Sequence, residues 1–124
     1  MEQDDVSIVD GISTTNMVVI EGVLKSEPTL REIGDGLQAR EFVVSTRVDG
    51  RIVNVPVACA ASLGASLGLG DRAFILGMVR TRFFASGGRT QSRTEVVASH
   101  VAGSRSKAVR TKALAEVASH LKTM

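Results

Sequence analysis

The sequence predicts an all-β domain: a small five-stranded barrel with one short helix inserted and a second helix after it. Short runs rich in Val, Ile and Leu recur along residues 16–103, separated by turns that contain Gly and Asp. Residues 59–69 break the strand pattern, and residues 104–124 replace it with a helical one. Residues 1–15 are polar and acidic, so the expected organisation is a flexible arm, a barrel and a tail.

The first strand is expected to be interrupted. Met17–Leu24 is β-branched and too short for a helix, and Pro28 follows it closely. Proline has no backbone N–H to donate, so it is confined to strand edges and bulges. Leu30–Ile33 then resumes the strand before the turn at Gly34-Asp35-Gly36.

A tight hairpin is predicted at Asp49-Gly50, between the strands Leu37–Val48 and Ile52–Val57. Both central residues of a type I′ turn need a positive φ, and Asp-Gly is one of the pairs that provides it. A short helix is expected next, over Cys59–Leu69, where two leucines lie four residues apart and glycines close the segment.

The last two strands are expected to form the longest hairpin, Ala73–Phe84 and Arg93–Val101, joined at Ser86-Gly87-Gly88. Alternation along the first of these strands places Arg80, Arg82 and Phe84 on one face. Three strands, a helix and two strands is the order of the OB-fold. Closing the barrel also removes the exposed sheet edges of such a β-rich chain.

The residue pattern of the tail, residues 104–124, predicts a basic amphipathic helix over Ala108–Leu121. Apolar residues recur in it four apart, and basic residues outnumber Glu116, its one acid. Such a helix can pack against protein, remain a loosely ordered tail, or contact nucleic acid.

Composition excludes several classes of protein. The chain has no Trp or Tyr, one cysteine (Cys59) and two histidines without ligand spacing. A disulfide scaffold, a zinc module and a haem protein are therefore excluded, and we expect no cofactor and no metal. No nucleotide-binding loop or catalytic constellation is present, so we expect no enzyme activity. The acidic start, Met1-Glu2-Gln3-Asp4-Asp5, is unlike a signal peptide and predicts a cytoplasmic, nucleoid-associated protein.

Charge is unevenly distributed along the chain. The net charge is +2, with −6 in residues 1–50 and +8 in residues 51–124. Such asymmetry indicates a surface for anions, and the alternative is an ordinary solvated charged face.

The order and spacing of several segments resemble the bacterial single-stranded DNA-binding protein (SSB) family. The segments are Asn16–Leu24, Glu27–Arg31, Phe42–Thr46, Gly70–Gly77, Val79–Phe84 and Thr94–Ala98. The match is sharpest at Val79-Arg80-Thr81-Arg82-Phe83-Phe84, where family members read Leu-Arg-Thr-Arg-Lys-Trp. The resemblance implies an OB-fold, a homotetramer, and sequence-independent binding of single-stranded DNA in replication, recombination and repair.

The chain also departs from that family. Phe84 stands where the family has Trp, and Val53 and Cys59 stand where it has two further aromatic residues. Each stacked base is worth about 1–3 kcal/mol, so fewer rings predict weaker binding. A basic segment replaces the acidic tip that recruits repair enzymes, which points to an auxiliary paralogue and to no recruitment through such a tip.

The candidate DNA-binding residues are cationic side chains that can follow phosphates and one ring on which a base can stack. They are Lys25, Arg31, Arg40, Arg47, Arg51, Arg80, Arg82, Phe84, Arg89 and Arg93. For each arginine the alternative is a solvated surface residue. For Phe84 it is packing in the barrel or between subunits.

An oligomer interface is expected at Phe74, Leu76 and Met78, an apolar stripe on the outward face of the longest strand. Two functions stay open on the sequence alone. One is an oligomeric single-stranded DNA-binding protein, and the other is an OB-fold adaptor that acts through protein contacts in replication restart.

Overall fold

The computed structural model describes residues 14–103 and 107–122, so most of the expected N-terminal arm lies outside the described residues. The strands are β1 (Val18–Leu24), β2 (Thr29–Gly34), β3 (Leu37–Val48), β4 (Arg51–Ala60), β5 (Arg72–Ser86) and β6 (Arg89–Gly103), and the helix is α2 (Lys107–Lys122).

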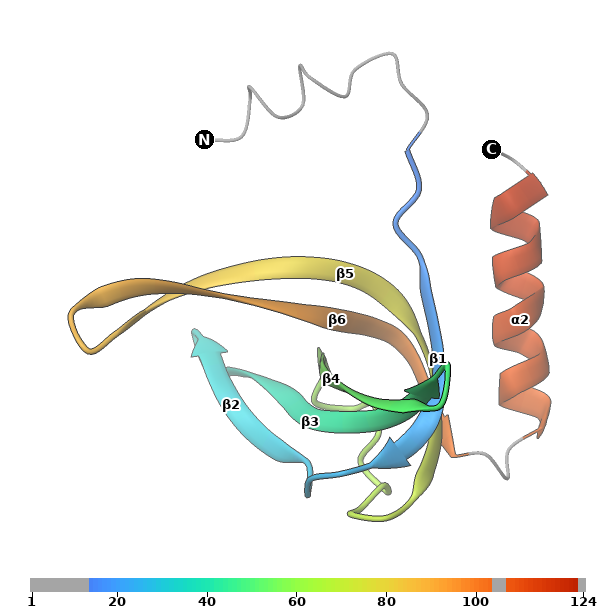
Figure 1. Ribbon diagram of the computed structural model, residues 1–124, viewed down its shortest axis with the longest axis horizontal. Helices are drawn as coiled ribbons and strands as arrows, with labels where there is room; N and C mark the ends of the chain where they lie inside the picture. Colours follow the sequence, from blue (N-terminus) through green and yellow to red (C-terminus); the bar gives the residue numbers. More distant parts are fainter. Residues whose placement is uncertain (1–13, 104–106, 123–124) are drawn as a thin grey trace.

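The strands close into a five-stranded barrel. Their order is β1-β5-β6-β4-β3-β2, and β1 also pairs with β3, which completes the circle. β4 and β6 run parallel, with Val57 opposite Val96, and the other pairs are antiparallel. β1 and β2 are the two halves of the strand that Pro28 interrupts, and both lie along β3. The predicted five-stranded OB-type barrel is confirmed (Figure 1).

The prediction of a short helix over Cys59–Leu69 is wrong. Two separate turns occupy this segment, closed by hydrogen bonds from Leu63 N to Ala60 O (2.9 Å) and from Leu67 N to Gly64 O (3.1 Å). Gly64 has a φ of +67°, which a right-handed helix cannot contain. The two leucines nevertheless pack against the barrel core, which explains their helix-like spacing.

The barrel interior is mostly aliphatic. Val44, Ile75 and Val57 are among its fully buried side chains, and Phe42 is its one buried ring. Cys59 belongs to this core, and burial raises the pKa of its thiol, although the positive charge of Arg40 partly opposes the shift. The thiol is therefore an inert core group at neutral pH.

The C-terminal helix is confirmed, and it packs against its own barrel. Ala113 is fully buried against Phe74 and Leu76 on the outer face of β5. Arg110 contributes an ion pair with Glu21 (3.0 Å), and its guanidinium lies over the Phe74 ring. Figure 1 shows α2 standing against one end of the barrel.

The packing of α2 buries two of the three residues expected at the oligomer interface. Phe74 and Leu76 do lie on the outer face of β5, but they are 2% and 6% exposed because α2 covers them. Of the three expected interface residues, only Met78 is exposed, at 51%. The exposed stripe on which the interface prediction rested is therefore absent from the single chain.

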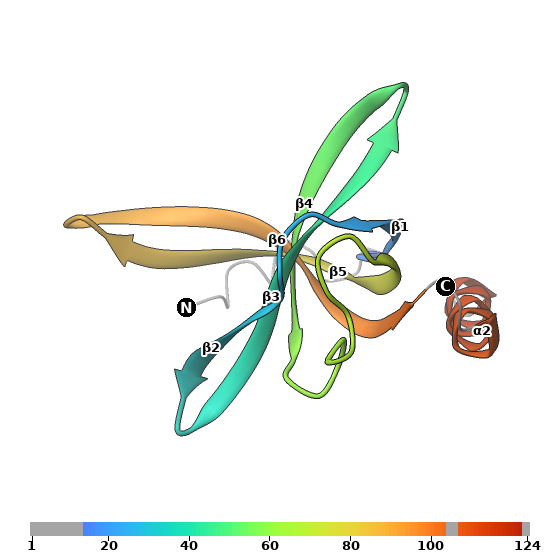
Figure 2. The same ribbon diagram turned by 90° about the horizontal axis from the view of Figure 1, so that it is seen from below.

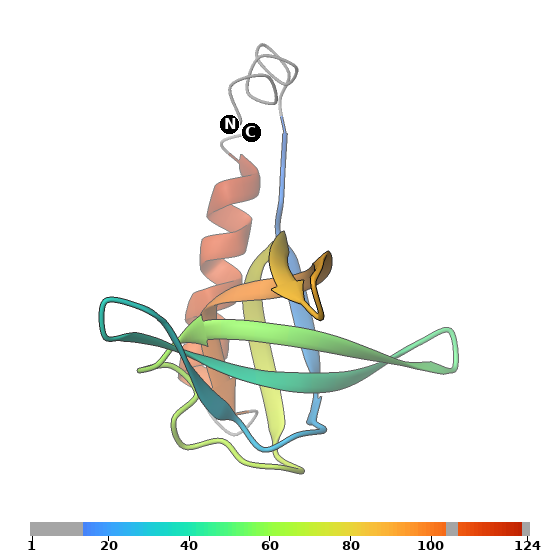
Figure 3. The same ribbon diagram turned by 90° about the vertical axis from the view of Figure 1, so that its left-hand side faces the viewer.

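Three hairpins project from the barrel in different directions: β2–β3, β3–β4 and β5–β6 (Figures 2 and 3). The predicted hairpin at Asp49-Gly50 is confirmed, with φ values of 50° and 78°. Gly87 and Gly88 turn β5–β6 in the same way, at 60° and 79°. Positive φ at both central residues matches the right-handed twist of the flanking strands, so the hairpins extend as twisted arms.

Candidate nucleic-acid interface

A groove of about 420 Å³ lies on the outside of the barrel, between the β2–β3 hairpin and β5. Figure 1 shows the β5–β6 hairpin arching above the β2–β3 hairpin, and both hairpins carry residues that line the groove. The groove is lined by Arg31, Ile33, Gln38, Ala39, Ala58, Cys59, Ala60, Arg80, Arg82 and Val97. Its walls carry arginines and its floor carries small side chains.

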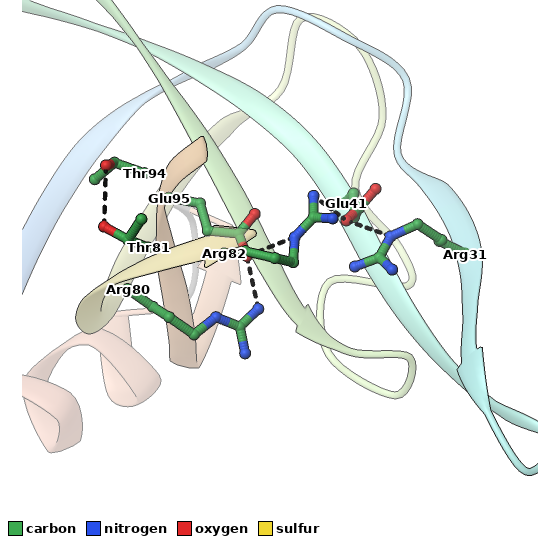
Figure 4. A network of polar contacts seen from close by, with 7 residues as sticks. All are labelled: Arg31, Glu41, Arg80, Thr81, Arg82, Thr94 and Glu95. Carbon is green, nitrogen blue, oxygen red and sulfur yellow. Dashed lines mark hydrogen bonds and ion pairs between the residues drawn. The ribbon is translucent and has the colours of Figure 1, made fainter. Parts of the chain in front are cut away.

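A row of alternating charges crosses this groove (Figure 4). On β2, Arg31 donates from Nε to Glu41 Oε2 at 2.7 Å. On β5, Arg80 donates from Nη2 to Glu95 Oε2 at 2.6 Å. Arg82 lies between the two carboxylates, 3.8 Å from Glu41 Oε2 and 3.4 Å from Glu95 Oε2. Three cations and two anions leave the row with a net charge of about +1.

Glu95 is the buried member of the row, at 3% exposure. Burial by itself raises the pKa of a carboxyl group. The hydrogen bond from Arg80 and the nearby charges of Arg82 and Arg80 outweigh burial, and the pKa of Glu95 is lowered. Glu95 is therefore ionised at neutral pH and fixes the positions of two arginines.

This coupling predicts a pH-dependent loss of stability. A carboxyl whose pKa is depressed by folding stabilises the native state above its unfolded pKa, and loses that effect as pH falls through its folded value. Glu95→Gln should therefore lower the free energy of unfolding by about 1–3 kcal/mol at pH 7. The difference from the unmodified protein should shrink below about pH 4. Urea unfolding at pH 7 and pH 3.5, with the more exposed Glu41→Gln as the control, measures both effects. An equal difference at both pH values would contradict the assignment.

The three arginines remain accessible despite these ion pairs. Side-chain exposure is 48% for Arg80, 35% for Arg31 and 24% for Arg82. A guanidinium has five N–H donors, and the carboxylates take only some of them. The row thus holds guanidinium groups in fixed positions with free donors, an arrangement suited to phosphate oxygens.

Phe84 lies beside this row, as alternation along the strand predicts. Its ring is half-buried, with the Arg82 guanidinium carbon 5.2 Å from the ring centroid. A cation over one face is a favourable contact and orients both groups. Phe84 is therefore part of the same cationic surface and not of the barrel core.

The other predicted DNA-binding residues lie in several different parts of the fold. Arg40 donates from Nε and Nη2 to Ala61 O, at 3.2 and 2.7 Å, and so holds the turns that follow β4. Lys25 lies in the connection between β1 and β2. Arg47 and Arg51 are exposed at the tip of β3–β4. Arg93 is exposed opposite Arg82 on β6, and Arg89 lies at the tip of the same hairpin.

The structure thus brings Arg31, Arg80, Arg82 and Phe84 together, with Arg93 beside them, and places Arg40 elsewhere. Cys59 was matched to a family ring, but its side chain packs in the core. The groove beside it is lined by the small residues Ala39, Ala58 and Ala60. No side chain on this floor can stack a base.

The sequence reading missed three residues of this surface. Glu41 and Glu95 are acids, and nothing in a search for cations selects them. The cross-strand register of the predicted hairpin could have identified Glu95, since Glu95 lies directly opposite Arg80. Phe83 is the third: at 70% it is the most exposed large apolar residue of the described chain. The length of β5 was its signal, because so long a strand extends past the barrel.

No protein-family model and no curated protein sequence matches the chain. Solved structures do match it. One is that of a Plasmodium falciparum SSB in complex with single-stranded DNA, which aligns with a TM-score of 0.61 and 15% sequence identity. The alignment covers 73% of this chain and 96% of that one. At this identity the likeness establishes the fold, an SSB-like OB-fold.

Residues 14–103 and 107–122 lack two further features. No helix there is both long and apolar enough to cross a membrane. No group of three or more His, Cys, Asp or Glu side chains there could hold a metal ion.

Proposed function

We propose that this protein binds single-stranded DNA independently of sequence and coats it during replication, recombination or repair. The observation that carries the proposal is the row of three arginines across the groove, with Phe84 at its edge. The fold likeness to an SSB–DNA complex supports it. Proteins of this kind combine a cationic groove for the phosphates with rings on which bases stack.

In this mechanism phosphates contact the free donors of Arg31, Arg80 and Arg82, and a base stacks on Phe84. The alanines of the groove offer no side-chain hydrogen bonds to base edges, so they read no sequence. Glu41 and Glu95 reduce the positive potential of the groove. Binding is consequently weaker than a groove of unpaired arginines would give.

Two observations favour the second candidate, an OB-fold adaptor that acts through protein contacts. The carboxylates already pair with the groove arginines, and the floor has no ring. An adaptor, however, has no need for Arg80, Arg82, Arg89 and Arg93 on a single hairpin. DNA binding is therefore the stronger proposal.

Fluorescence anisotropy with labelled oligo(dT) at 50 and 200 mM salt distinguishes the two functions. A DNA-binding protein should show affinity that falls with salt, with a log–log slope of about −0.7 for each phosphate contacted. Absence of binding at 50 mM salt would leave the adaptor as the surviving candidate.

Phe84→Ala should weaken oligo(dT) binding by about 1–3 kcal/mol and leave the salt slope nearly unchanged, because stacking releases no counterions. Phe84→Trp should preserve or strengthen binding. Anisotropy titrations and thermal melts measure both variants. A lower melting temperature with unaltered affinity would instead assign the ring to packing.

We propose a homotetramer, an auxiliary paralogue of the bacterial SSB type, in the cytoplasm with the nucleoid. With Phe74 and Leu76 under α2, the exposed Met78 and Val19 are the apolar residues left on this side for contacts between copies. Sedimentation at micromolar concentration tests the assembly, and a monomer would contradict it.

A further inference from the structure

The β5–β6 hairpin extends well beyond the barrel as a two-stranded arm. Pairing between β1 and β5 ends at Val18 opposite Gly77, and the Asn16 side chain then bonds the backbone of Val79. Pairing between β5 and β6 continues to Ser86 opposite Arg89. Figures 1 and 2 show this outer part of the hairpin projecting away from the other strands.

The arm has two chemically different faces, because directly paired residues of neighbouring strands share a face. One face carries every charged side chain between residues 80 and 95: Arg80, Arg82, Arg89, Arg93 and Glu95, together with Phe84. The other face carries Thr81, Phe83, Ala85, Thr90, Ser92 and Thr94. This second face is uncharged, and its one large side chain is a ring.

Phe83 is 70% exposed on this uncharged face. Ser92 lies directly opposite it, and the hydroxyls of Thr81 and Thr94 meet at 3.3 Å beside it. None of these neighbours is large enough to cover a phenyl ring. Phe84 differs, since it is half-buried and has Arg82 over one of its faces.

We propose that Phe83 is a second base-stacking platform, so that single-stranded DNA passes around the arm and contacts both of its faces. This inference rests on the proposed function and adds a contact to it. Phosphates on the charged face bind Arg80, Arg82 and Arg93, and a base beyond the arm stacks on Phe83. Gly87 and Gly88 form the tip, where the absence of side chains leaves room for the strand to pass.

A base suits this face better than a second protein copy does. Protein interfaces need a contiguous apolar patch of several hundred Å², and here one ring stands among hydroxyl groups. A stacked base needs only one exposed ring. Hydroxyl groups such as those of Thr81, Ser92 and Thr94 can hydrogen-bond the sugar or phosphate of the same nucleotide.

The test compares Phe83→Ala with Phe84→Ala and with Leu69→Ala, an equally simple truncation of a residue that is 60% exposed in the turns after β4. Phe83→Ala should weaken oligo(dT) binding about 5- to 150-fold, with the salt slope and the melting temperature unchanged. Leu69→Ala should change nothing. Phe83→Trp provides a single tryptophan in a chain that has none, and its fluorescence should be quenched by saturating oligo(dT).

Wild-type affinity in Phe83→Ala, with no quenching of the Phe83→Trp fluorescence, would overturn the inference and leave the proposed function intact. A change in sedimentation without a change in DNA affinity would also overturn it, and would assign the ring to contacts between copies. Failure of the unmodified protein to bind any single-stranded DNA would overturn both.

Discussion

Replacing Arg80 and Arg82 together with alanine should weaken single-stranded DNA binding about 100-fold or more. Each charged hydrogen bond contributes about 1.5–3 kcal/mol, and the double variant loses at least two of them. The log–log salt slope should become shallower by about 1.4, because two phosphate contacts no longer release counterions. Affinity for oligo(dT), oligo(dC) and oligo(dA) should fall equally, since phosphate contacts carry no sequence information.

The buried Glu95 carboxylate determines in which form of the protein the double variant should be made. Without Arg80 and Arg82, Glu95 would be a buried anion with no partner, which is strongly destabilising. The measurement is therefore made in the Glu95→Gln background, where the arginines can be removed without stranding a charge.

Arg72→Ala is the matched control, because Arg72 is an exposed arginine of the same strand at its other end, opposite Val23. It removes one positive charge from the same strand and should leave the affinity for DNA nearly unchanged. Equal losses in Arg72→Ala and in the double variant would indicate a general charge effect. An unchanged salt slope in the double variant would show that DNA does not occupy the groove.

The order of the strands and the face of the arginines were predictable from local rules. Asp49-Gly50 needed only its own turn chemistry, and the placement of Arg82 and Phe84 needed only the two-residue period of a strand. Both rules depend on nearest neighbours in the sequence. The second rule succeeds because β5 has no irregularity between Arg82 and Phe84.

The errors have other causes, and two of the three come from contact between distant segments. The spacing of Leu63 and Leu67 fits a helix as well as two turns, and the positive φ of Gly64 selects the turns. Phe74 and Leu76 do alternate outward, but the pattern does not show that α2 covers them. Arg40 has the same chemistry as Arg80, and only the fold turns it towards Ala61 O.

The candidate site was therefore about half predictable. Arg31, Arg80, Arg82 and Phe84 follow from charge, alternation and resemblance. Glu41 and Glu95 do not, because their role comes from ion pairs with Arg82, which reaches Glu41 on another hairpin and Glu95 on the neighbouring strand. The groove exists because the barrel closes and brings β2 and β5 to opposite sides of it.

That closure leads to the prediction with the largest effect on stability. Gly22 lies where β1 leaves β5 and joins β3: Gly22 pairs with Ala73, and the next residue, Val23, pairs with both Arg72 and Ser45. A Cβ at Gly22 would lie 2.2 Å from Ser45 O and 2.9 Å from Val44 Cγ1. A backbone oxygen cannot move aside without breaking the β1–β3 pairing.

Gly22→Ala should therefore destabilise the protein by about 3 kcal/mol or more, a large share of the 5–15 kcal/mol typical of a domain. It should also weaken DNA binding, because the β1 junction fixes β3 and β5, which carry Glu41, Arg80 and Arg82. Gly103→Ala is the control: it is also a strand glycine, but its added Cβ meets only Leu67 Cδ2, at 3.8 Å. Urea unfolding should show little change in the control, since replacing an unstrained glycine costs nothing in the native state. Equal unfolding free energies for the two variants would mean that close approach at Gly22 does not hold the barrel closed.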